Sequence, residues 1–372
     1  MAVNTHESST AESPPPHITP DARELMGGLL SDADLLAERG TASPPDIDLC
    51  MRLGAGHPAG PFQLRQAGTI ASPHRSEDGP AAAEVSESWT GPVGLAGTGH
   101  MAAGIAEAMV RSGREVRVLG RSAASAQRLH EVVAASLARQ VSRGRLDEPT
   151  SQAVMARLEP VGNAAQLGEV DVVIEAVAED IEVKLSVLRD LNDQLHHTVP
   201  IATNTSSYRV SDLRASVSPG RPVLALHFFN PAAVMKLVEV VVPEDVSAEN
   251  PSLEERAHAW VRALGKTPVR CGDSRGFVVN RLLIPFLNDA VAAHATGRPA
   301  EEVDATLVEG AHHPMGPLAL IDLIGIDVTV AALESMFEAE PEPRLRPHPL
   351  LTQMAATGEL GRKSARGFYD YR

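Results

Sequence analysis

The feature that most constrains this chain is a glycine-rich turn between a short apolar run, residues 93–96, and a helix of small residues. The turn reads Gly97-Thr98-Gly99-His100-Met101-Ala102. Gly97 permits a tight turn, Gly99 lets the backbone approach a pyrophosphate, and Ala102 stands where a third glycine often packs helix against strand. Free amides at the start of the helix would hold phosphates. The turn therefore predicts dinucleotide contacts from Gly97, Gly99, His100, Met101 and Ala102, and the alternative is a helix entry that happens to be rich in glycine.

Strand-like and helix-like stretches alternate from residue 91 onward. The expected strands are residues 93–96, 116–119, 171–176, 201–203, 223–227, 237–241 and 269–271. This alternation predicts a doubly wound, mostly parallel α/β sheet of the Rossmann type over residues 91–273. The pattern becomes helical after Gly276, which predicts an all-helical C-terminal domain over residues 274–372.

The first 90 residues form an extension that partly repeats the helical domain. Residues 46–64 align with residues 302–320 with eight of 19 positions identical, and residues 30–33 parallel residues 287–290. We therefore expect a partial helical repeat at about residues 25–66, preceded by a tail and followed by a flexible linker. The repeat either packs against the other copy or is a loosely folded remnant.

Composition limits the class of protein. The chain has 372 residues, of which 43% are hydrophobic, enough for two or three domains. Its net charge of −15 disfavours a nucleic-acid partner. Because it has only two cysteines, no signal-peptide core and no long apolar run, we expect a cytoplasmic protein that does not span a membrane. We expect no bound metal.

The end of the second expected strand bears on the choice of dinucleotide. An NAD-preferring site places a carboxylate there to bind the ribose 2′-hydroxyl, but this chain has Gly120, Arg121 and Ser122 instead. The guanidinium and the hydroxyl form a plausible pocket for a 2′-phosphate, which favours NADP over NAD. The alternative is that Arg121 is a solvated surface residue and NAD binds without its usual anchor.

A series of further motifs follows in order. They are Glu175-Ala176-Val177-Ala178-Glu179, Asn204-Thr205-Ser206-Ser207, His227-Phe228-Phe229-Asn230-Pro231, Lys236-Leu237-Val238-Glu239-Val240, Gly276-Phe277-Val278-Val279-Asn280-Arg281, and Gly361-Arg362-Lys363-Ser364 with Gly367-Phe368-Tyr369. With them, residues 91–372 resemble the 3-hydroxyacyl-CoA dehydrogenase family, including its short-chain 3-hydroxybutyryl-CoA members. Family members commonly dimerise through the helical domain, so the resemblance implies a homodimer; the N-terminal repeat would either occupy that surface or widen the dimer.

The resemblance also implies the catalytic residues. His227 would exchange a proton with the 3-hydroxyl group while hydride passes between C3 and the nicotinamide, and Glu239 would orient the imidazole and stabilise its protonated form. Ser206 and Asn280 would hydrogen-bond the substrate oxygens. Each residue taken alone has a structural explanation: a histidine hydrogen-bonded at a strand end, a glutamate at a sheet edge, and two helix caps.

The resemblance implies two further sets of contacts. Glu179, Lys184, Asn230 and Lys363 would approach the coenzyme, although an ordinary set of surface ion pairs explains them as well. Residues 124–143 and 147–158 are expected to form a helical hairpin that resembles the family's CoA-binding arm. Ser136 and Arg143 fall at its CoA contacts, and the alternative there is a solvated helix face.

These observations predict an NADP- or NAD-dependent 3-hydroxyacyl-CoA dehydrogenase that interconverts an L-3-hydroxyacyl-CoA, of short chain, and its 3-oxo form. Two alternatives stay open. One is the same chemistry on a hydroxyacyl group carried by an acyl carrier protein in a biosynthetic pathway. The other is a dinucleotide-binding protein that has kept the fold and lost turnover.

Overall fold

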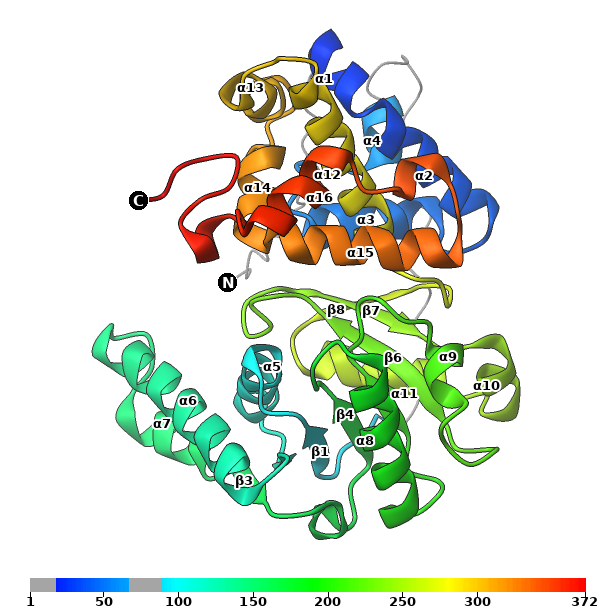
Figure 1. Ribbon diagram of the computed structural model, residues 1–372. Helices are drawn as coiled ribbons and strands as arrows, with labels where there is room; N and C mark the ends of the chain where they lie inside the picture. Colours follow the sequence, from blue (N-terminus) through cyan, green and yellow to red (C-terminus); the bar gives the residue numbers. More distant parts are fainter. Residues whose placement is uncertain (1–17, 67–87) are drawn as a thin grey trace, which may run out of the picture.

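The computed structural model describes residues 18–66 and 88–372. They form two lobes, an α/β lobe and an all-helical lobe (Figure 1). The helical lobe contains both the first and the last described helices, so segments far apart in the sequence lie side by side in it. Within the described ranges, no helix has both the length and the apolar character that crossing a bilayer requires.

An eight-stranded sheet forms the centre of the α/β lobe, with the order β3-β2-β1-β4-β5-β6-β7-β8. The strands are β1 Val93–Ala96, β2 Val116–Leu119, β3 Leu158–Val161, β4 Val172–Glu175, β5 Ile201–Thr203, β6 Val223–Phe228, β7 Leu237–Val241 and β8 Thr267–Arg270. Neighbouring strands are parallel, except that β6 and β7 are antiparallel. The predicted doubly wound sheet followed by a helical domain is confirmed. The strand β3 was not predicted, because Glu159 and Pro160 give it no apolar run.

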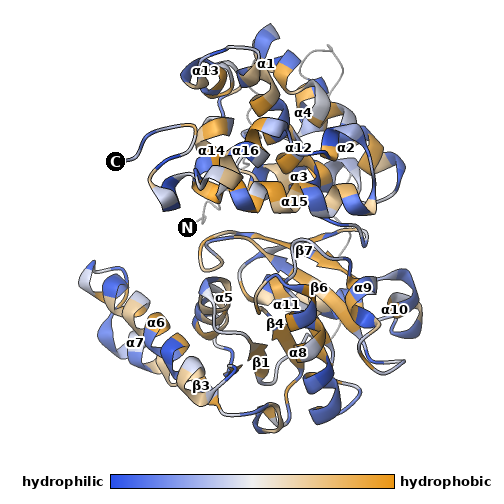
Figure 2. Ribbon diagram, in the orientation of Figure 1, coloured by the Kyte–Doolittle hydropathy of each residue, from blue (hydrophilic) through white to orange (hydrophobic). Residues whose placement is uncertain are grey.

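Apolar burial explains why these segments become strands. All residues of β1, β4, β6 and β7 are buried, as expected for strands that are covered on both faces. Figure 2 shows the central strands β4 and β6 as hydrophobic, with more hydrophilic helices around them. The helices of this lobe are α5 His100–Arg111, α6 Ala123–Ser142, α7 Glu148–Met155, α8 Ile181–Gln194, α9 Val210–Arg214, α10 Glu244–Glu249 and α11 Leu253–Ala263, with the 3₁₀ turn η1 Ala164–Leu167. Helices α6 and α7 pack on each other at one side of the lobe (Figure 1).

Two sets of helices build the helical lobe. The C-terminal set is α12 Val279–Ala295, α13 Ala300–Gly310, α14 Pro317–Ile324, α15 Ile326–Ala339 and α16 Pro349–Thr357, with the 3₁₀ turns η2 Pro343–Leu345 and η3 Arg362–Ser364. The N-terminal set is α1 Pro20–Leu25, α2 Gly27–Glu38, α3 Pro44–Gly54 and α4 Pro61–Gln66. The two sets share one hydrophobic core, and α2 lies against α12. The tail and most of the linker that the sequence predicted lie outside the described residues.

The buried carboxylate of Asp322 anchors the C-terminal tail. Asp322 on α14 is 1% exposed and accepts hydrogen bonds from three groups of the tail. The donors are Phe368 N at 3.0 Å, Tyr369 N at 3.0 Å and the Tyr371 hydroxyl at 3.1 Å. The tail that contains Lys363 is therefore held against α14.

Replacing Asp322 by alanine should destabilise the protein by at least about 1–3 kcal/mol, because the substitution leaves half-buried amide donors without partners. The measurement is the free energy of unfolding in urea. Asp370→Ala is the matched control, since Asp370 lies in the same tail but is exposed. An unfolding free energy for Asp322→Ala equal to that of the control would show that the anchor contributes nothing.

Candidate active site

A cleft of about 1960 Å³ lies between the lobes. One side of it is formed by residues at or just after the carboxyl ends of β1, β2, β4, β5 and β6, and the other side by residues of α12, α14 and α15. Ligands of doubly wound sheets bind at this edge of the strands. The cleft is therefore the candidate site, and its position brings residues of both lobes together.

The glycine-rich turn forms one end of the cleft and fits a dinucleotide. Gly97 has φ of +129°, and a Cβ atom there would collide with the Ala176 carbonyl, so the position requires glycine. Gly99 precedes α5, and no side chain caps that helix. The first amides of α5 are thus left for an anionic ligand, and a pyrophosphate matches them in charge and hydrogen bonding. Ala102 is buried in the packing of α5 and does not line the cleft, whereas His100 and Met101 do.

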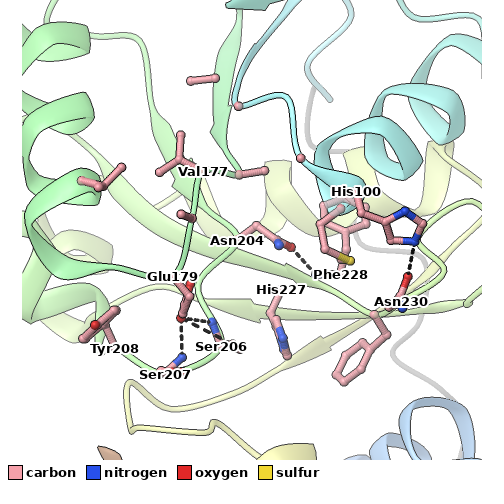
Figure 3. Close-up of a pocket in the computed structure, with 18 of the residues that line it drawn as sticks. His100, Val177, Glu179, Asn204, Ser206, Ser207, Tyr208, His227, Phe228 and Asn230 are labelled. Atoms are coloured by element: carbon pink, nitrogen blue, oxygen red, sulfur yellow. Dashed lines mark hydrogen bonds between the residues drawn. The ribbon is translucent and has the colours of Figure 1, made fainter. Parts of the chain in front are cut away.

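A hydrogen bond joins this turn to the loop after β6. The His100 Nε2 atom lies 3.1 Å from Asn230 Oδ1. Figure 3 marks this hydrogen bond with a dashed line. Both side chains line the cleft. The contact brings together two residues that the sequence assigned to the coenzyme, although they lie 130 positions apart in the chain.

His227 and Glu239 form a hydrogen-bonded pair in the sheet. The antiparallel register of β6 and β7 sets them directly opposite each other, and His227 Nδ1 lies 2.7 Å from Glu239 Oε2. Glu239 is fully buried, while His227 is 5% exposed and lines the cleft. Its Nε2 atom has no protein partner among residues 18–66 and 88–372. The free ring nitrogen is thus available to a ligand in the cleft.

Further contacts fix this pair. The other carboxylate oxygen of Glu239, Oε1, accepts hydrogen bonds from Val278 N at 3.0 Å and Val279 N at 2.9 Å, at the entry to α12. The imidazole ring also packs against Phe229 and Phe277, with centroid distances of 4.5 and 5.6 Å. Since an ionised carboxylate only accepts hydrogen bonds, Nδ1 of His227 is the donor in this pair, which leaves Nε2 as the ring nitrogen that a ligand in the cleft can meet.

Ser206 is held by a network around Glu179. The Glu179 carboxylate accepts hydrogen bonds from Ser206 N and Ser207 N, both at 2.8 Å (Figure 3). It also accepts one from the Thr205 hydroxyl at 2.6 Å. Burial opposes ionisation, but the charge of Lys184 and these donors outweigh it and lower the pKa of Glu179. The anionic Glu179 therefore shapes the loop that presents Ser206 to the cleft.

Lys184 lies behind this network rather than in the cleft wall. It is 1% exposed and bonds Glu175 Oε1 at 3.0 Å and Glu179 Oε2 at 3.1 Å. Burial lowers the pKa of Lys184, but the two carboxylates more than compensate, and the net shift is upward. Lys184 thus acts on the cleft through Glu179, and its direct contact with a coenzyme stays a prediction.

Asn280 and Ser206 reach the cleft from different lobes. Asn280 lies in the first turn of α12, directly after the two amides that bind Glu239, and both Asn280 and Ser206 line the cleft. The structure therefore brings Ser206, His227 and Asn280 to one cavity, with Glu239 behind the histidine.

The remaining predicted residues lie farther from this group. Arg121 lines the cleft, but Ser122 does not; its hydroxyl caps α6 in a reciprocal pair with Ser125. Ser136 is half-buried on α6, and Arg143 is exposed at the end of that helix, outside the cleft wall. Lys363 pairs with Asp327 on α15, also outside the cleft wall.

Sequence reasoning missed several residues of the cleft. Asn204 accepts a hydrogen bond from Phe228 N at 2.8 Å and so ties the end of β5 to β6. Arg275 lines the cleft and bonds Glu338 at 2.8 Å. Gly54 and Ala55, from the N-terminal helices, line it as well. Asn204 lies in a motif that the sequence did single out, whereas nothing local marks the other three.

Comparison with known proteins gives matches over the same ranges. Residues 92–274 match the NAD binding domain of 3-hydroxyacyl-CoA dehydrogenase, and residues 23–79 and 276–371 match the C-terminal domain of that enzyme. A 3-hydroxybutyryl-CoA dehydrogenase of Mycobacterium tuberculosis is 40% identical over 286 residues, 75% of this chain and 98% of the relative. One from Clostridioides difficile is 34% identical over 276 residues, 74% of this chain and 97% of the relative.

Solved structures agree with these matches. The crystal structure of Mycobacterium tuberculosis FadB2 aligns with a TM-score of 0.70 and 38% identity, and the alignment covers 77% of this chain and 100% of that one. The (S)-3-hydroxybutyryl-CoA dehydrogenase of Ralstonia eutropha aligns with a TM-score of 0.70 and 36% identity, over 76% of this chain and 99% of that one. The chain therefore belongs to the 3-hydroxyacyl-CoA dehydrogenase family.

Proposed function

We propose that this protein is a 3-hydroxyacyl-CoA dehydrogenase that interconverts L-3-hydroxyacyl-CoA and 3-oxoacyl-CoA with a nicotinamide dinucleotide. The observation that carries the proposal is the His227–Glu239 pair at 2.7 Å, placed in the same cleft as the glycine-rich turn and the uncapped end of α5. The relatives named above are 3-hydroxybutyryl-CoA dehydrogenases, which supports a short acyl chain.

His227 transfers the proton. A bound nicotinamide supplies or accepts the hydride at C3 of the substrate. In the oxidative direction, Nε2 of His227 takes the proton of the 3-hydroxyl group, and in the reductive direction it returns that proton. Glu239 keeps the other ring nitrogen protonated and stabilises the imidazolium that forms, since a nearby carboxylate favours the charged ring.

Ser206 and Asn280 bind the substrate oxygens. Their side chains approach from the α/β lobe and from the helical lobe, so a substrate bound by both lies between the lobes beside His227. Hydrogen bonds to the oxygen on C3 hold it within reach of the imidazole and stabilise negative charge there. Glu179 sets the position of Ser206 through the two loop amides that it binds.

The coenzyme and CoA contacts are proposed from position and charge. Gly97, Gly99 and the first amides of α5 hold the pyrophosphate, while Glu179 and Asn230 lie in the cleft wall. We propose NADP as the preferred coenzyme because Arg121 lies in the cleft wall after β2. The arm formed by α6 and α7 contacts CoA through Ser136 and Arg143. The cytoplasmic location remains a prediction. Of the two roles expected for the N-terminal repeat, the packing of α2 against α12 favours occupation of the dimer surface over a widened homodimer.

The coenzyme preference can be measured directly. The kcat/KM for NADPH should exceed that for NADH with acetoacetyl-CoA, since Arg121 offers a positive charge for the 2′-phosphate. Arg121→Ala should reduce the value for NADPH more than that for NADH. A strong preference of the wild-type protein for NADH would end the NADP proposal.

Replacing His227 by alanine should lower kcat by about 10²–10⁴-fold, the contribution typical of general acid–base catalysis. The assay is the absorbance change at 340 nm with acetoacetyl-CoA and reduced coenzyme. His196→Ala, an exposed histidine on the α/β lobe, is the control and should retain full activity. Near-normal turnover of His227→Ala would remove this residue from the mechanism.

Replacing Arg143 by glutamate should raise the KM for acetoacetyl-CoA with little change in the KM for the coenzyme, because the substitution puts a negative charge where a CoA phosphate is proposed to bind. Arg189→Glu on α8 makes the same charge change at an exposed position away from the α6–α7 arm. If both variants have the same KM for acetoacetyl-CoA, the arm does not bind CoA through Arg143.

A further inference from the structure

The two sets of helices in the helical lobe have the same internal construction. Both match the same C-terminal family domain, over residues 23–79 and 276–371. In each set one buried aspartate, Asp48 or Asp304, accepts hydrogen bonds from two amides at the start of a later helix. The amides that they bind are Phe62 N at 2.8 Å and Gln63 N at 3.1 Å for Asp48, and Leu318 N at 2.8 Å and Ala319 N at 3.0 Å for Asp304. Residues 18–66 are thus a second, shorter copy of the same fold.

The contacts between the copies are reciprocal. A Cβ atom on Gly54, at the end of α3, would lie 2.7 Å from Val279 Cγ2, and a Cβ atom on Gly310, at the end of α13, would lie 3.1 Å from Ala22 Cβ. Gly54 aligns with Gly310, and Ala22 aligns with Val279 when residues 30–33 are laid over 287–290. Each copy therefore presents the same glycine to the same position of the other copy.

Equivalent residues also meet near the middle of this interface. His57 and His313 stack with a centroid distance of 4.1 Å, and α2 lies against its counterpart α12. Arg344 bonds both Asp32 and Asp289, another equivalent pair. In a two-fold interface between identical subunits, residue i of one subunit contacts residue j of the other and the reverse, and near the axis a residue meets its own equivalent. The contacts between the two sets of helices follow this pattern. Here one chain forms the whole interface.

The N-terminal copy also reaches the catalytic pair. Ligand atoms of Cys50 on α3, Cys271 and Glu239 all lie within 4.8 Å of one another, and all three residues are buried. The Gly272 amide donates to the Thr41 carbonyl at 2.6 Å. These contacts put α3 directly behind the carboxylate that orients His227.

Gly54 continues this contact into the cleft. Besides Val279, a Cβ atom there would lie 2.8 Å from Leu237 Cδ2, on the strand that carries Glu239. Gly54 and Ala55 both line the cleft. A larger residue at position 54 would therefore press on the side chain of Val279, the residue whose amide binds Glu239 and which precedes Asn280.

We infer that residues 18–66 act as a built-in second subunit. They cover the self-complementary face of the helical domain, so the chain works as a monomer. Through Cys50, Gly54 and Ala55 they also form a wall of the catalytic centre and position Glu239. The inference that the chain is a monomer does not depend on the proposed activity. The inference that these residues position Glu239 for catalysis rests on the proposed function.

Light scattering of the full-length chain at micromolar concentrations tests the first part. The expected mass is that of one chain, 39.4 kDa, at all concentrations. A dimer of twice that mass would overturn the inference. This measurement needs no substrate, so it stays informative if the protein turns out to have another activity.

A matched pair of variants tests the second part. Gly54→Ala and Gly310→Ala each add one methyl group at equivalent places in the interface, but only Gly54 contacts the catalytic segments. Gly54→Ala should lower kcat on the order of tenfold or more with the KM for the coenzyme unchanged, because a misplacement of about 1 Å near the chemistry can cost about 10²-fold. Gly310→Ala should lower the unfolding temperature to a similar degree and keep the wild-type kcat. Equal values of kcat in the two variants would contradict the positioning role.

A second pair protects the test against misfolding of Gly54→Ala. Cys50→Ala removes the sulfur behind Glu239, and Met51→Ala removes a side chain of equal burial on the same helix that is not part of the Cys50–Glu239–Cys271 cluster. Only Cys50→Ala should show the fall in kcat with an unchanged KM for the coenzyme. The same kcat in both variants would mean that α3 has a structural role alone.

Discussion

The buried carboxylate of Glu239 is the interaction on which the rest of the site depends. One oxygen binds His227 on the neighbouring strand, and the other binds two amides at the entry to α12. A carboxylate that is buried away from solvent needs such partners, because the desolvation of an unpaired charge costs much free energy. The same three hydrogen bonds that satisfy Glu239 therefore fix the imidazole of His227 and connect the sheet to the helical lobe.

The arrangement of the lobes follows from this connection. Since α12 begins at the amides that Glu239 binds, Asn280 enters the cleft from the first turn of that helix. Across the cleft, Glu179 performs a similar task for the loop of Ser206. Two acids, Glu239 buried in the sheet and Glu179 in the cleft wall, thus position the two side chains proposed to bind the substrate oxygens. The N-terminal helices add to this scheme, since α3 covers the far side of Glu239.

The sequence predicted the parts of the fold and site that depend on local pattern. The strand, the glycine-rich turn and the small-residue helix are contiguous, so their geometry follows from residues 93–111 alone. The family resemblance implied that Glu239 orients His227, and the register of two antiparallel strands, which was not predicted, explains how the two residues meet. The strand β3 was not predicted because Pro160 interrupts its apolar pattern.

Contacts between segments that lie far apart in the chain could not be predicted from local sequence patterns. Lys184 was assigned to the coenzyme, yet the structure buries it between Glu175 and Glu179, a pairing that no local pattern reveals. The repeat at residues 25–66 was visible as an alignment, but its contact with the sheet was not, because Cys50 and Cys271 are separated by more than half the chain. Ser122 has the residue type expected for phosphate binding, but its hydroxyl caps a helix.

The measurement that tests the central claim most directly is the steady-state kinetics of Glu239→Gln. The amide has the size of the carboxylate but offers an NH₂ group to Nδ1, which would move the ring proton to Nε2 and remove the base from the cleft. The account predicts that kcat falls by about 10²–10⁴-fold while the KM for the coenzyme and the unfolding temperature stay close to wild type. A kcat equal to that of the wild-type protein would contradict it.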